Sequence, residues 1–369
     1  METFVMDRLK EKKIWVVVGT RPEAIKQVPV YWKLCERFGN ECVALVSSGQ
    51  HRELLTQALA HFGVEPDADF SLMKEGQSLS ESAANTLRTM GAAIEVNAPE
   101  WVLVQGDTTT AAMAAWAAFQ TKCRVLHVEA GLRSYDLNHP FPEEANRKLI
   151  SVVAARHAAP TDHAKSALLK EGVPEHAIRV TGNTGIDALV WTLKHKIQAS
   201  EGKCREVLIT AHRRENRGNF GAYFRILKNF CEARSDLHFV MPMHPNDFAR
   251  ADAKKFLSSL QNVDLVPPLD YVATCEVLAR SLFVITDSGG IQEEASSLGA
   301  RVVICRSTTE RPEAVMAGRA RLAPADDEPA FKSALEWAAE SERRNAGREI
   351  VCPLFGEGNA ASKIADWFE

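Results

Sequence analysis

Short apolar runs rich in Val, Ile and Leu alternate along the chain with longer stretches in which apolar residues recur every three or four positions. Consecutive apolar positions predict strands buried on both faces, as in a parallel sheet, and the longer stretches predict the helices that cover it. In the first half the predicted strands are Ile14–Val18, Val43–Val46, Trp101–Val104, Arg124–Val128 and His157–Ala159, and the predicted helices are Glu23–Phe38, Glu53–Phe62, Ser80–Val96 and Thr108–Thr121.

The second half repeats this alternation, and a chain of 369 residues is longer than one hydrophobic core usually serves. We therefore predict an α/β protein with two doubly wound Rossmann-like domains, residues 14–185 and 204–355. A polar linker is expected over 186–203, a loose leader over 1–13 and a final helix within 356–369 that could belong to either half. The predicted strands of the second half are Val207–Thr210, His238–Met241, Val263–Val266, Phe283–Thr286 and Val302–Cys305.

Composition excludes several classes of protein. The net charge is −4, with a sequence pI of about 6.3, so the chain has no overall preference for nucleic acid or another polyanion. Eight cysteines without a C-x-x-C pair predict buried thiols in a reducing compartment. No apolar segment is long enough for a signal peptide or a membrane span, so we expect a cytoplasmic protein.

Open α/β sheets bind ligands at the carboxyl ends of their strands, so the residues at those ends are the candidates. Gly19 to Lys26 (GTRPEAIK) forms a turn that opens a helix with Arg21 and Lys26 on its first turns, which suits an anion. Asp287 to Glu294 (DSGGIQEE) offers glycines that let the backbone approach a diphosphate, with Ser288 and Glu294 beside them. An ordinary capped helix explains either segment equally well when it is taken alone.

Three carboxylates follow predicted strands or open a helix. Asp107 comes after the strand 101–104, where it could also act as a helix cap. Glu129 closes an apolar strand and precedes Ala-Gly, which leaves it without an obvious structural task. Glu143 stands in a first helical turn, where an acidic residue also complements the helix dipole.

His212 and His244 follow two strands of the second half, and His212 precedes a pair of arginines. Carboxylates, histidines and arginines at strand ends indicate proton transfer beside a bound anion. The sequence contains no H-E-x-x-H motif and no other metal-binding spacing of His and acidic residues. We therefore expect neither a metal nor a cofactor.

With these residues in view, the chain resembles the non-hydrolysing UDP-N-acetylglucosamine 2-epimerases from about residue 14 to residue 369. The resemblance rests on motifs in family order: GTRPEAIK (19–26), SGQHRE (48–53), GDTTT (106–110), HVEAGLR (127–133), FPEEANR (141–147), TGNT (181–184), AHRREN (211–216), DSGGIQEEASSLG (287–299) and TTERPEAV (308–315).

This resemblance implies a two-domain fold of the glycosyltransferase-B type, with a nucleotide sugar in the interdomain cleft and a C-terminal helix that packs back on the first domain. It also implies a cytoplasmic homodimer that interconverts UDP-GlcNAc and UDP-ManNAc and supplies ManNAc units for a cell-surface polysaccharide. The residues implied to bind UDP are Arg21, Lys26, Ser288, Gly289, Gly290 and Glu294, and those implied around the sugar are Asp107, Glu129, Glu143 and His212.

The family commonly uses UDP-GlcNAc as an activator at a second site, and Gln50, His51, Arg213 and His244 match positions associated with that site. The chain departs from the family pattern at Gly76, at Gln105, where His is frequent, at Ser307, and in the order of residues 244–247. We therefore expect weaker allosteric activation, which a strongly sigmoidal reverse reaction relieved by trace UDP-GlcNAc would contradict.

Four other functions remain open. A hydrolysing relative would release ManNAc and UDP from the same intermediate, and an epimerase for a modified UDP sugar would share most of the motifs. A glycosyltransferase of the same fold would need an acceptor, and a nucleotide-sugar sensor would bind without turnover.

Overall fold

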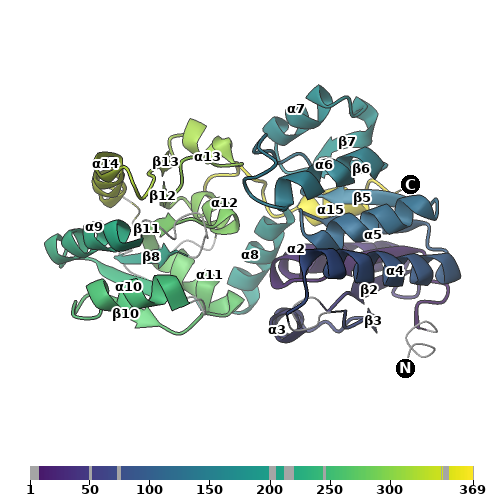
Figure 1. Cartoon of the computed structure of the whole chain (residues 1–369), viewed down its shortest axis with the longest axis horizontal. Coiled ribbons are helices and arrows are strands. Elements are labelled where there is room, and N and C mark those ends of the chain that lie inside the picture. Colours follow the sequence, from purple (N-terminus) through teal and green to yellow (C-terminus); the bar gives the residue numbers. More distant parts are fainter. Residues whose placement is uncertain are drawn as a thin grey trace. The chain divides into compact units, whose positions relative to one another are not determined.

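The structure, a computed structural model, describes residues 8–49, 52–72, 76–198, 205–211, 220–243, 247–341, 343 and 349–368. The chain divides into two compact units: unit 1 comprises residues 1–188 and 355–369, and unit 2 comprises residues 189–354. Each unit is a parallel sheet with helices packed against it (Figure 1).

Unit 1 has a seven-stranded sheet in the order β3-β2-β1-β4-β5-β6-β7, and every neighbouring pair is parallel. The central strands are buried at every position because helices cover both faces, which explains why they are apolar without alternation. The strands are β1 (Ile14–Val18), β2 (Val43–Ser47), β3 (Ala68–Asp69), β4 (Trp101–Gln105), β5 (Arg124–Val128), β6 (Arg156–Ala159) and β7 (Ile178–Val180).

The helices of unit 1 follow its strands in the βα order expected from the sequence. Helix α5 packs against both α4 and α6. Its six alanines and Thr110 are buried, because small side chains let a helix lie close to its neighbours. The helices are α2 (Arg21–Phe38), α3 (Arg52–His61), α4 (Leu79–Asn97), α5 (Thr109–Gln120), α6 (Glu143–Val153), α7 (Asp162–Lys170), the start of α8 (Thr184–His195) and α15 (Ala360–Ala365), with a 3₁₀ turn at Glu175–Ala177.

Unit 2 has a six-stranded parallel sheet in the order β10-β9-β8-β11-β12-β13 around its own apolar core. Its strands are β8 (Glu206–Thr210), β9 (His238–Pro242), β10 (Val263–Val266), β11 (Ser281–Thr286), β12 (Arg301–Ile304) and β13 (Ala320–Leu322). Its helices are α9 (Phe220–Ala233), α10 (Asp247–Leu257), α11 (Tyr271–Arg280), α12 (Gly289–Ser297), α13 (Pro312–Met316) and α14 (Glu328–Ala339).

The strand order reverses once in each sheet, between β1 and β4 in unit 1 and between β8 and β11 in unit 2. At such a switch point the connections leave in opposite directions, which opens a crevice beyond the carboxyl ends of the two strands. Gly19 and Gly106 follow the two strands at the first switch point, and Ala211 and Asp287 follow those at the second.

Four expectations about the chain need correction. The leader is not loose over its described part, because Leu9 is fully buried in the core of unit 1 and Lys12 bonds to the carbonyl of Val43. The expected linker is instead helical over residues 186–195, which belong to α8 and bury Ile186, Leu189 and Leu193. Of the seven cysteines described, all as free thiols, only Cys231, Cys275 and Cys305 are buried. The final helix, which the sequence pattern predicts over 362–368, spans Ala360–Ala365.

Three short strands, β3, β7 and β13, were not predicted. Each lies at a sheet edge and has only two or three residues, too few to form a recognisable apolar run. Among the described residues, no helix is long and apolar enough to cross a bilayer.

Candidate active site

The predicted carboxylates of unit 1 lie just beyond the switch point of its sheet. Gln105, the last residue of β4, pairs with Val128, the last residue of β5. Asp107 and Glu129 therefore follow neighbouring strands at the same sheet edge, as the sequence predicts. The backbone N–H of Gly106 donates to the carbonyl of Val128 at 3.0 Å and holds the two turns together.

Glu129 is held by donors from three other elements. Its Oε1 accepts from Lys26 Nζ of α2 at 2.5 Å and from Asn183 Nδ2 at 2.7 Å, and its Oε2 accepts from Gln105 Nε2. Glu129 also adopts a positive φ of 62°, a conformation rarely found outside glycine and concentrated at functional sites. Its side chain is only 5% exposed, so the carboxylate is buried, paired with a cation and fixed in orientation.

Asp107 is more accessible, with 28% of its side chain exposed, and only one of its oxygens is bonded. Oδ2 accepts from Arg147 Nη2 at 2.6 Å and from Arg147 Nε at 2.8 Å. Oδ1 accepts no hydrogen bond from the described residues. Asp107 is not the helix cap, because Thr108 performs that task by accepting from the N–H of Ala111. The alternative structural explanation for Asp107 is therefore wrong.

Helix α6 carries the residues that support Asp107. Arg147 also donates from Nη1 to Glu144 Oε2 at 3.0 Å, and Glu144 is fully buried. The carboxylate of Glu144 further accepts the backbone N–H groups of Ser134 and Tyr135. Oε2 of the neighbouring Glu143 is buried without a hydrogen bond from the described residues. A buried oxygen in this state is costly unless a proton or a ligand satisfies it.

The turn from Gly19 to Glu23 is a capped helix start, as one reading of the sequence allowed. Thr20 caps α2, and Glu23 Oε2 accepts from the N–H groups of Gly19 and Thr20. Glu23 Oε1 also accepts from Thr108 Oγ1 at 2.6 Å, which joins the turns after β1 and β4. Arg21 opens the helix at intermediate exposure. Lys26 was expected to bind UDP, but its ammonium group lies on Glu129, with only 13% of the side chain exposed.

His127 lies in β5 just before this site, and its Nε2 donates to the carbonyl of Gly106 at 2.7 Å, which leaves Nδ1 as the unprotonated nitrogen. Burial lowers the pKa of His127 to about 3, and burial lowers the pKa of the nearby His157 to about 4. Both rings are therefore neutral at physiological pH, and neither supplies an acidic proton there.

This burial predicts that the free energy of unfolding decreases as the pH falls from about 6.5 towards 4. In that range the unfolded chain protonates both histidines and the folded chain does not, so each costs up to about 1.4 kcal/mol per pH unit. Asp187 opposes the trend, because burial raises its pKa to about 6 and the folded state takes up a proton there. Urea unfolding at several pH values measures the slope. His127→Gln, which keeps a donor for Gly106, should reduce it, whereas His176→Gln, at an exposed position, should not; equal slopes in all three proteins would contradict the assignment.

In unit 2 the predicted anion-binding turn lies at the start of α12. Ser288 is the N-cap residue by position, but its hydroxyl makes no capping bond, and its N–H donates to Thr286 Oγ1 at 2.9 Å. A side chain at Gly290 would meet nothing within 4 Å, so the backbone there faces open space. Glu294 is 9% exposed and accepts from the hydroxyl of Tyr271 at 3.0 Å. The first turn of α12 therefore has open space beside Gly290, and its N–H groups lack intrahelical partners, as an anion site at a helix start requires.

The segment after β12 fixes the start of α12. Arg311 is bonded through Nε to Glu293, and its guanidinium lies against Gly289, where an added Cβ would come within 2.6 Å of Cζ. Thr309 Oγ1 donates to Gln292 Oε1 at 2.9 Å, and a buried pair between Arg306 and Glu310 at 2.9 Å holds the segment itself. Gly289 is therefore required by its close neighbour.

Five predicted residues lie outside the part of the chain that the structure describes: the catalytic candidate His212 and the candidates for a second site Gln50, His51, Arg213 and His244. Within the described part, no group of three or more His, Cys, Asp and Glu side chains is arranged to hold a metal ion.

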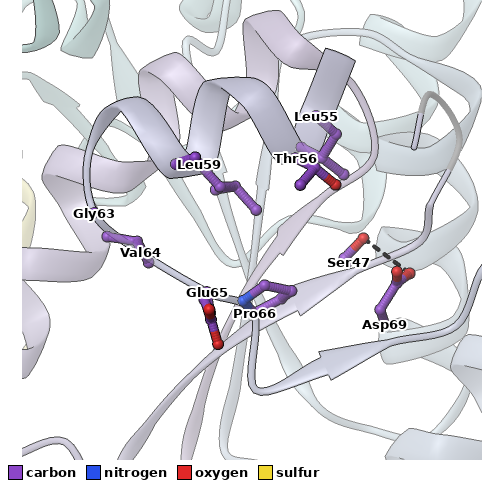
Figure 2. A pocket seen from close by; sticks show the side chains of 10 residues that line it. Ser47, Leu55, Thr56, Leu59, Gly63, Val64, Glu65, Pro66 and Asp69 are labelled. Carbon is purple, nitrogen blue, oxygen red and sulfur yellow. Dashed lines mark hydrogen bonds between the residues drawn. The ribbon is translucent and has the colours of Figure 1, made fainter. Parts of the chain in front are cut away.

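A separate hollow of about 380 Å³ lies between α3, strand β2 and the edge strand β3 (Figure 2). Leu55 and Leu59 of α3 line it together with Val64 and Pro66, and none of the predicted site residues does. Thr56 and Glu65 also line it, and two further polar residues, Ser47 and Asp69, bond to one another at 3.1 Å. This largely apolar hollow therefore offers no chemistry to compare with that at the switch point.

Comparisons with known proteins agree with this geometry. The profile of the family described as UDP-N-acetylglucosamine 2-epimerase matches residues 35–369. A relative of that name from Bacillus subtilis (strain 168) is 39% identical, over 97% of this chain and 95% of its own length. The chain belongs to the UDP-N-acetylglucosamine 2-epimerase family. Members of this family are isomerases, so the chain is predicted correctly as an enzyme of that class.

Solved epimerases share the fold of the whole chain. The crystal structure of the epimerase from Neisseria meningitidis bound to UDP-GlcNAc has 38% identity and a TM-score of 0.87, and the match covers 96% of this chain and 98% of that one. The epimerase from Methanocaldococcus jannaschii, in complex with UDP-GlcNAc and UDP, has 28% identity and a TM-score of 0.80, with coverage of 96% and 98%. A glycosyltransferase of kitacinnamycin, at 13% identity and a TM-score of 0.62, shares the fold alone. The predicted glycosyltransferase-B type of fold is confirmed.

Three residues that bond to candidate residues were not singled out from the sequence: Asn183, Arg147 and Tyr271. Glu144, which pairs with Arg147, was not singled out either. Asn183 and Arg147 belong to the motifs TGNT and FPEEANR. The motifs therefore mark their positions in the sequence, but they do not predict which carboxylate each residue contacts. In the sequence, Gln105 stands out only as a departure from the family pattern. In the structure, its amide donates to Glu129.

Proposed function

We propose that this chain interconverts UDP-GlcNAc and UDP-ManNAc without net hydrolysis, by elimination of UDP and its re-addition after inversion at C2. The observation that carries the proposal is the pair of carboxylates at neighbouring strand ends, each with its own cation: Glu129 with Lys26, and Asp107 with Arg147. Related epimerases are described with UDP-GlcNAc bound. Two fixed carboxylates at one site suit a reaction that removes a proton and returns one to the opposite face.

The chemistry requires bond cleavage before proton transfer. The C2 proton of the sugar has no adjacent carbonyl, so its direct removal to a carbanion is too difficult near neutral pH. When the anomeric C–O bond breaks and UDP leaves with the electron pair, C1 gains oxocarbenium character, which acidifies the C2 proton. Loss of that proton gives 2-acetamidoglucal. UDP then adds back to C1 as a proton arrives at the other face of C2.

We assign Asp107 and Glu129 to the two proton transfers. Asp107 has an oxygen without a hydrogen bond from the described residues and is partly exposed, so it can reach a substrate proton. Glu129 is oriented by its three donors, and Lys26 becomes its counterion rather than a ligand of UDP. Glu143, with a buried unbonded oxygen, would bind a sugar hydroxyl or act as a supporting acid.

Departure of UDP requires stabilisation of the diphosphate charge. In this proposal the start of α12, with Ser288, Gly289 and Gly290, receives the diphosphate, and Glu294 accepts from the ribose hydroxyls. Arg21 adds positive charge, and His212 assists the leaving group. The ion pair between Arg311 and Glu293 holds this first turn in place. Its N–H groups therefore need not reorganise when the charge of the leaving diphosphate develops.

The test is incubation of the protein with UDP-GlcNAc in deuterium oxide, followed by NMR. We expect deuterium at C2 and the appearance of UDP-ManNAc. Free ManNAc as the main product would favour the hydrolysing alternative, product formation that depends on an added acceptor would favour a glycosyltransferase, and binding alone would favour a sensor. Turnover of only a modified UDP sugar would change the substrate and keep the mechanism.

The homodimer and the supply of ManNAc for a polysaccharide remain predictions from family resemblance. The cytoplasmic location remains a prediction from the cysteines and apolar segments, and weak allosteric activation one from the departures from the family pattern. Size-exclusion chromatography with light scattering tests the first, and initial rates of the reverse reaction with and without trace UDP-GlcNAc test the last.

A further inference from the structure

Two side-chain bonds of Asn183 determine which of its atoms faces Glu129. Its Oδ1 accepts from the N–H of Gly185, in the first turn of α8, at 2.9 Å. Its Nδ2 donates to Glu129 Oε1 at 2.7 Å. Because the carbonyl oxygen is occupied at the start of α8, the amide nitrogen must point to the carboxylate. Asn183 is 1% exposed, so water does not replace either bond.

The same residue lies where the chain passes between its two units. The chain leaves unit 1 after Ala188, within α8, and returns at Phe355. The N–H of Asn183 donates to the carbonyl of Phe355 at 2.7 Å, and Gly182 packs against the backbone of Gly356. Asp187 accepts from the N–H groups of Ala360 and Ala361. The outgoing and returning segments are therefore bonded together within unit 1, and Asn183 connects them to Glu129.

We propose that Asn183 is a positioning residue that holds Glu129 in its reactive orientation and makes that orientation depend on the two crossing segments. This inference rests on the proposed role of Glu129 in proton transfer. The physical reason is the cost of the orientation: Glu129 has a positive φ and a buried carboxylate, so its side chain keeps one rotamer only while its donors remain in place. Lys26 neutralises the charge of the Glu129 carboxylate, and the bond from Asn183 helps to fix the orientation of that carboxylate.

The main test compares Asn183→Asp with the parent. Aspartate keeps the same size and still accepts from the N–H of Gly185, so α8 stays capped. It loses the donor and turns a carboxylate towards Glu129. We expect kcat to fall by about 10²-fold with KM changed less than about threefold, since Asn183 is 1% exposed and offers almost no surface to a substrate. Asn183→Ser retains a capping oxygen but is too short to donate to Glu129. It should give the same result, a large fall in kcat with little change in KM.

A double-mutant cycle on thermal unfolding tests the contact without any assay of activity. Asn183→Asp should lower Tm by at least about 2 °C, because two carboxylates then face each other. In a Glu129→Gln background the same change should cost much less, because glutamine donates to the new aspartate. Equal Tm losses in both backgrounds would overturn the contact. If the parent protein fails to epimerise UDP-GlcNAc, the proposed function fails while this cycle still reports on the contact.

Dependence on the crossing segments is tested with glycines. Gly356 has a φ of 112°, and a Cβ there would lie 3.0 Å from Gly182 Cα. Gly356→Ala should therefore displace Gly182 and Asn183 and lower kcat at a temperature well below Tm. Gly318→Ala is the matched control, because Gly318 also has a positive φ, of 65°, and its Cβ would meet nothing within 4 Å. Equal kcat values for the two variants, or unchanged kcat in Asn183→Asp with an active parent, would overturn the inference and leave the proposed function standing.

Discussion

Asp107→Asn is expected to lower kcat for epimerisation by a factor of about 10²–10⁴, the range in which a positioned acid or base contributes. The amide has the shape of the carboxylate and can still accept from Arg147, so the fold around α6 should persist. It cannot take up the C2 proton. UDP should still bind with nearly unchanged affinity, because Asp107 is not among its proposed ligands, which are Arg21 and the start of α12. Steady-state kinetics and calorimetric titration with UDP measure the two effects.

The control for this substitution is Asp162→Asn, an exposed position in the first turn of α7. It removes the same charge from the same unit and should leave kcat unchanged. Deuterium exchange at C2 adds a more direct readout, since it should slow together with turnover in Asp107→Asn. Turnover close to that of the parent would remove Asp107 from the mechanism, whereas loss of UDP binding would indicate a general structural defect.

The second large effect is expected on stability. Arg147→Met should lower the free energy of unfolding by about 3 kcal/mol, because it leaves the carboxylate of Glu144 buried without its cation. Glu144 is fully buried, and Arg147 is 5% exposed and also pairs with Asp107. Activity should fall as well, since Asp107 loses the group that orients it. Chemical unfolding measures the first effect and kcat the second.

An exposed ion pair serves as the control, because breaking it removes the same kind of charge interaction without leaving a buried charge unpaired. Lys33 pairs with Glu36 at 2.6 Å, but the side chains are 43% and 69% exposed, so Lys33→Met should cost less than about 1 kcal/mol. Adding Glu144→Gln to Arg147→Met should recover part of the lost stability, because the unpaired charge disappears. The recovery should be partial, since Ser134 and Tyr135 donate to different oxygens of Glu144 and the single amide oxygen of glutamine keeps only one of these bonds. No recovery in the double variant would assign the loss to packing of the long side chain instead.

The strands were predictable because their signal is local. The run Ile14–Val18 is apolar at every position, and the structure places β1 over that same range at the centre of its sheet. Edge strands such as β3 and β13 escaped prediction because two or three residues form too short a pattern. The linker was predicted because residues 193–203 are mostly polar and contain no strand-like apolar run. Helix α8 begins earlier, at Thr184, and its apolar residues are spaced as on one face of a helix, so they do not form such a run.

The candidate site was predicted as a set of positions and not as a set of contacts. Asp107 and Glu129 could be placed together because parallel strands end at one edge. The alternative that Asp107 caps a helix could not be decided before Thr108 was seen in that role. Lys26 was placed with the anion-binding group because Arg21 precedes it, yet one helical turn separates them and the ammonium group lies on Glu129.

The sequence by itself therefore determined two parallel-sheet units and the strand ends at which the candidate residues stand, since apolar runs and turn residues act over a few neighbouring positions. Only the tertiary structure decided which donors hold each carboxylate. Lys26 and Asn183 are 103 and 54 positions from Glu129, and Arg147 is 40 positions from Asp107. Contacts over such separations depend on strand order, register and helix packing, and these arise only when the whole unit folds.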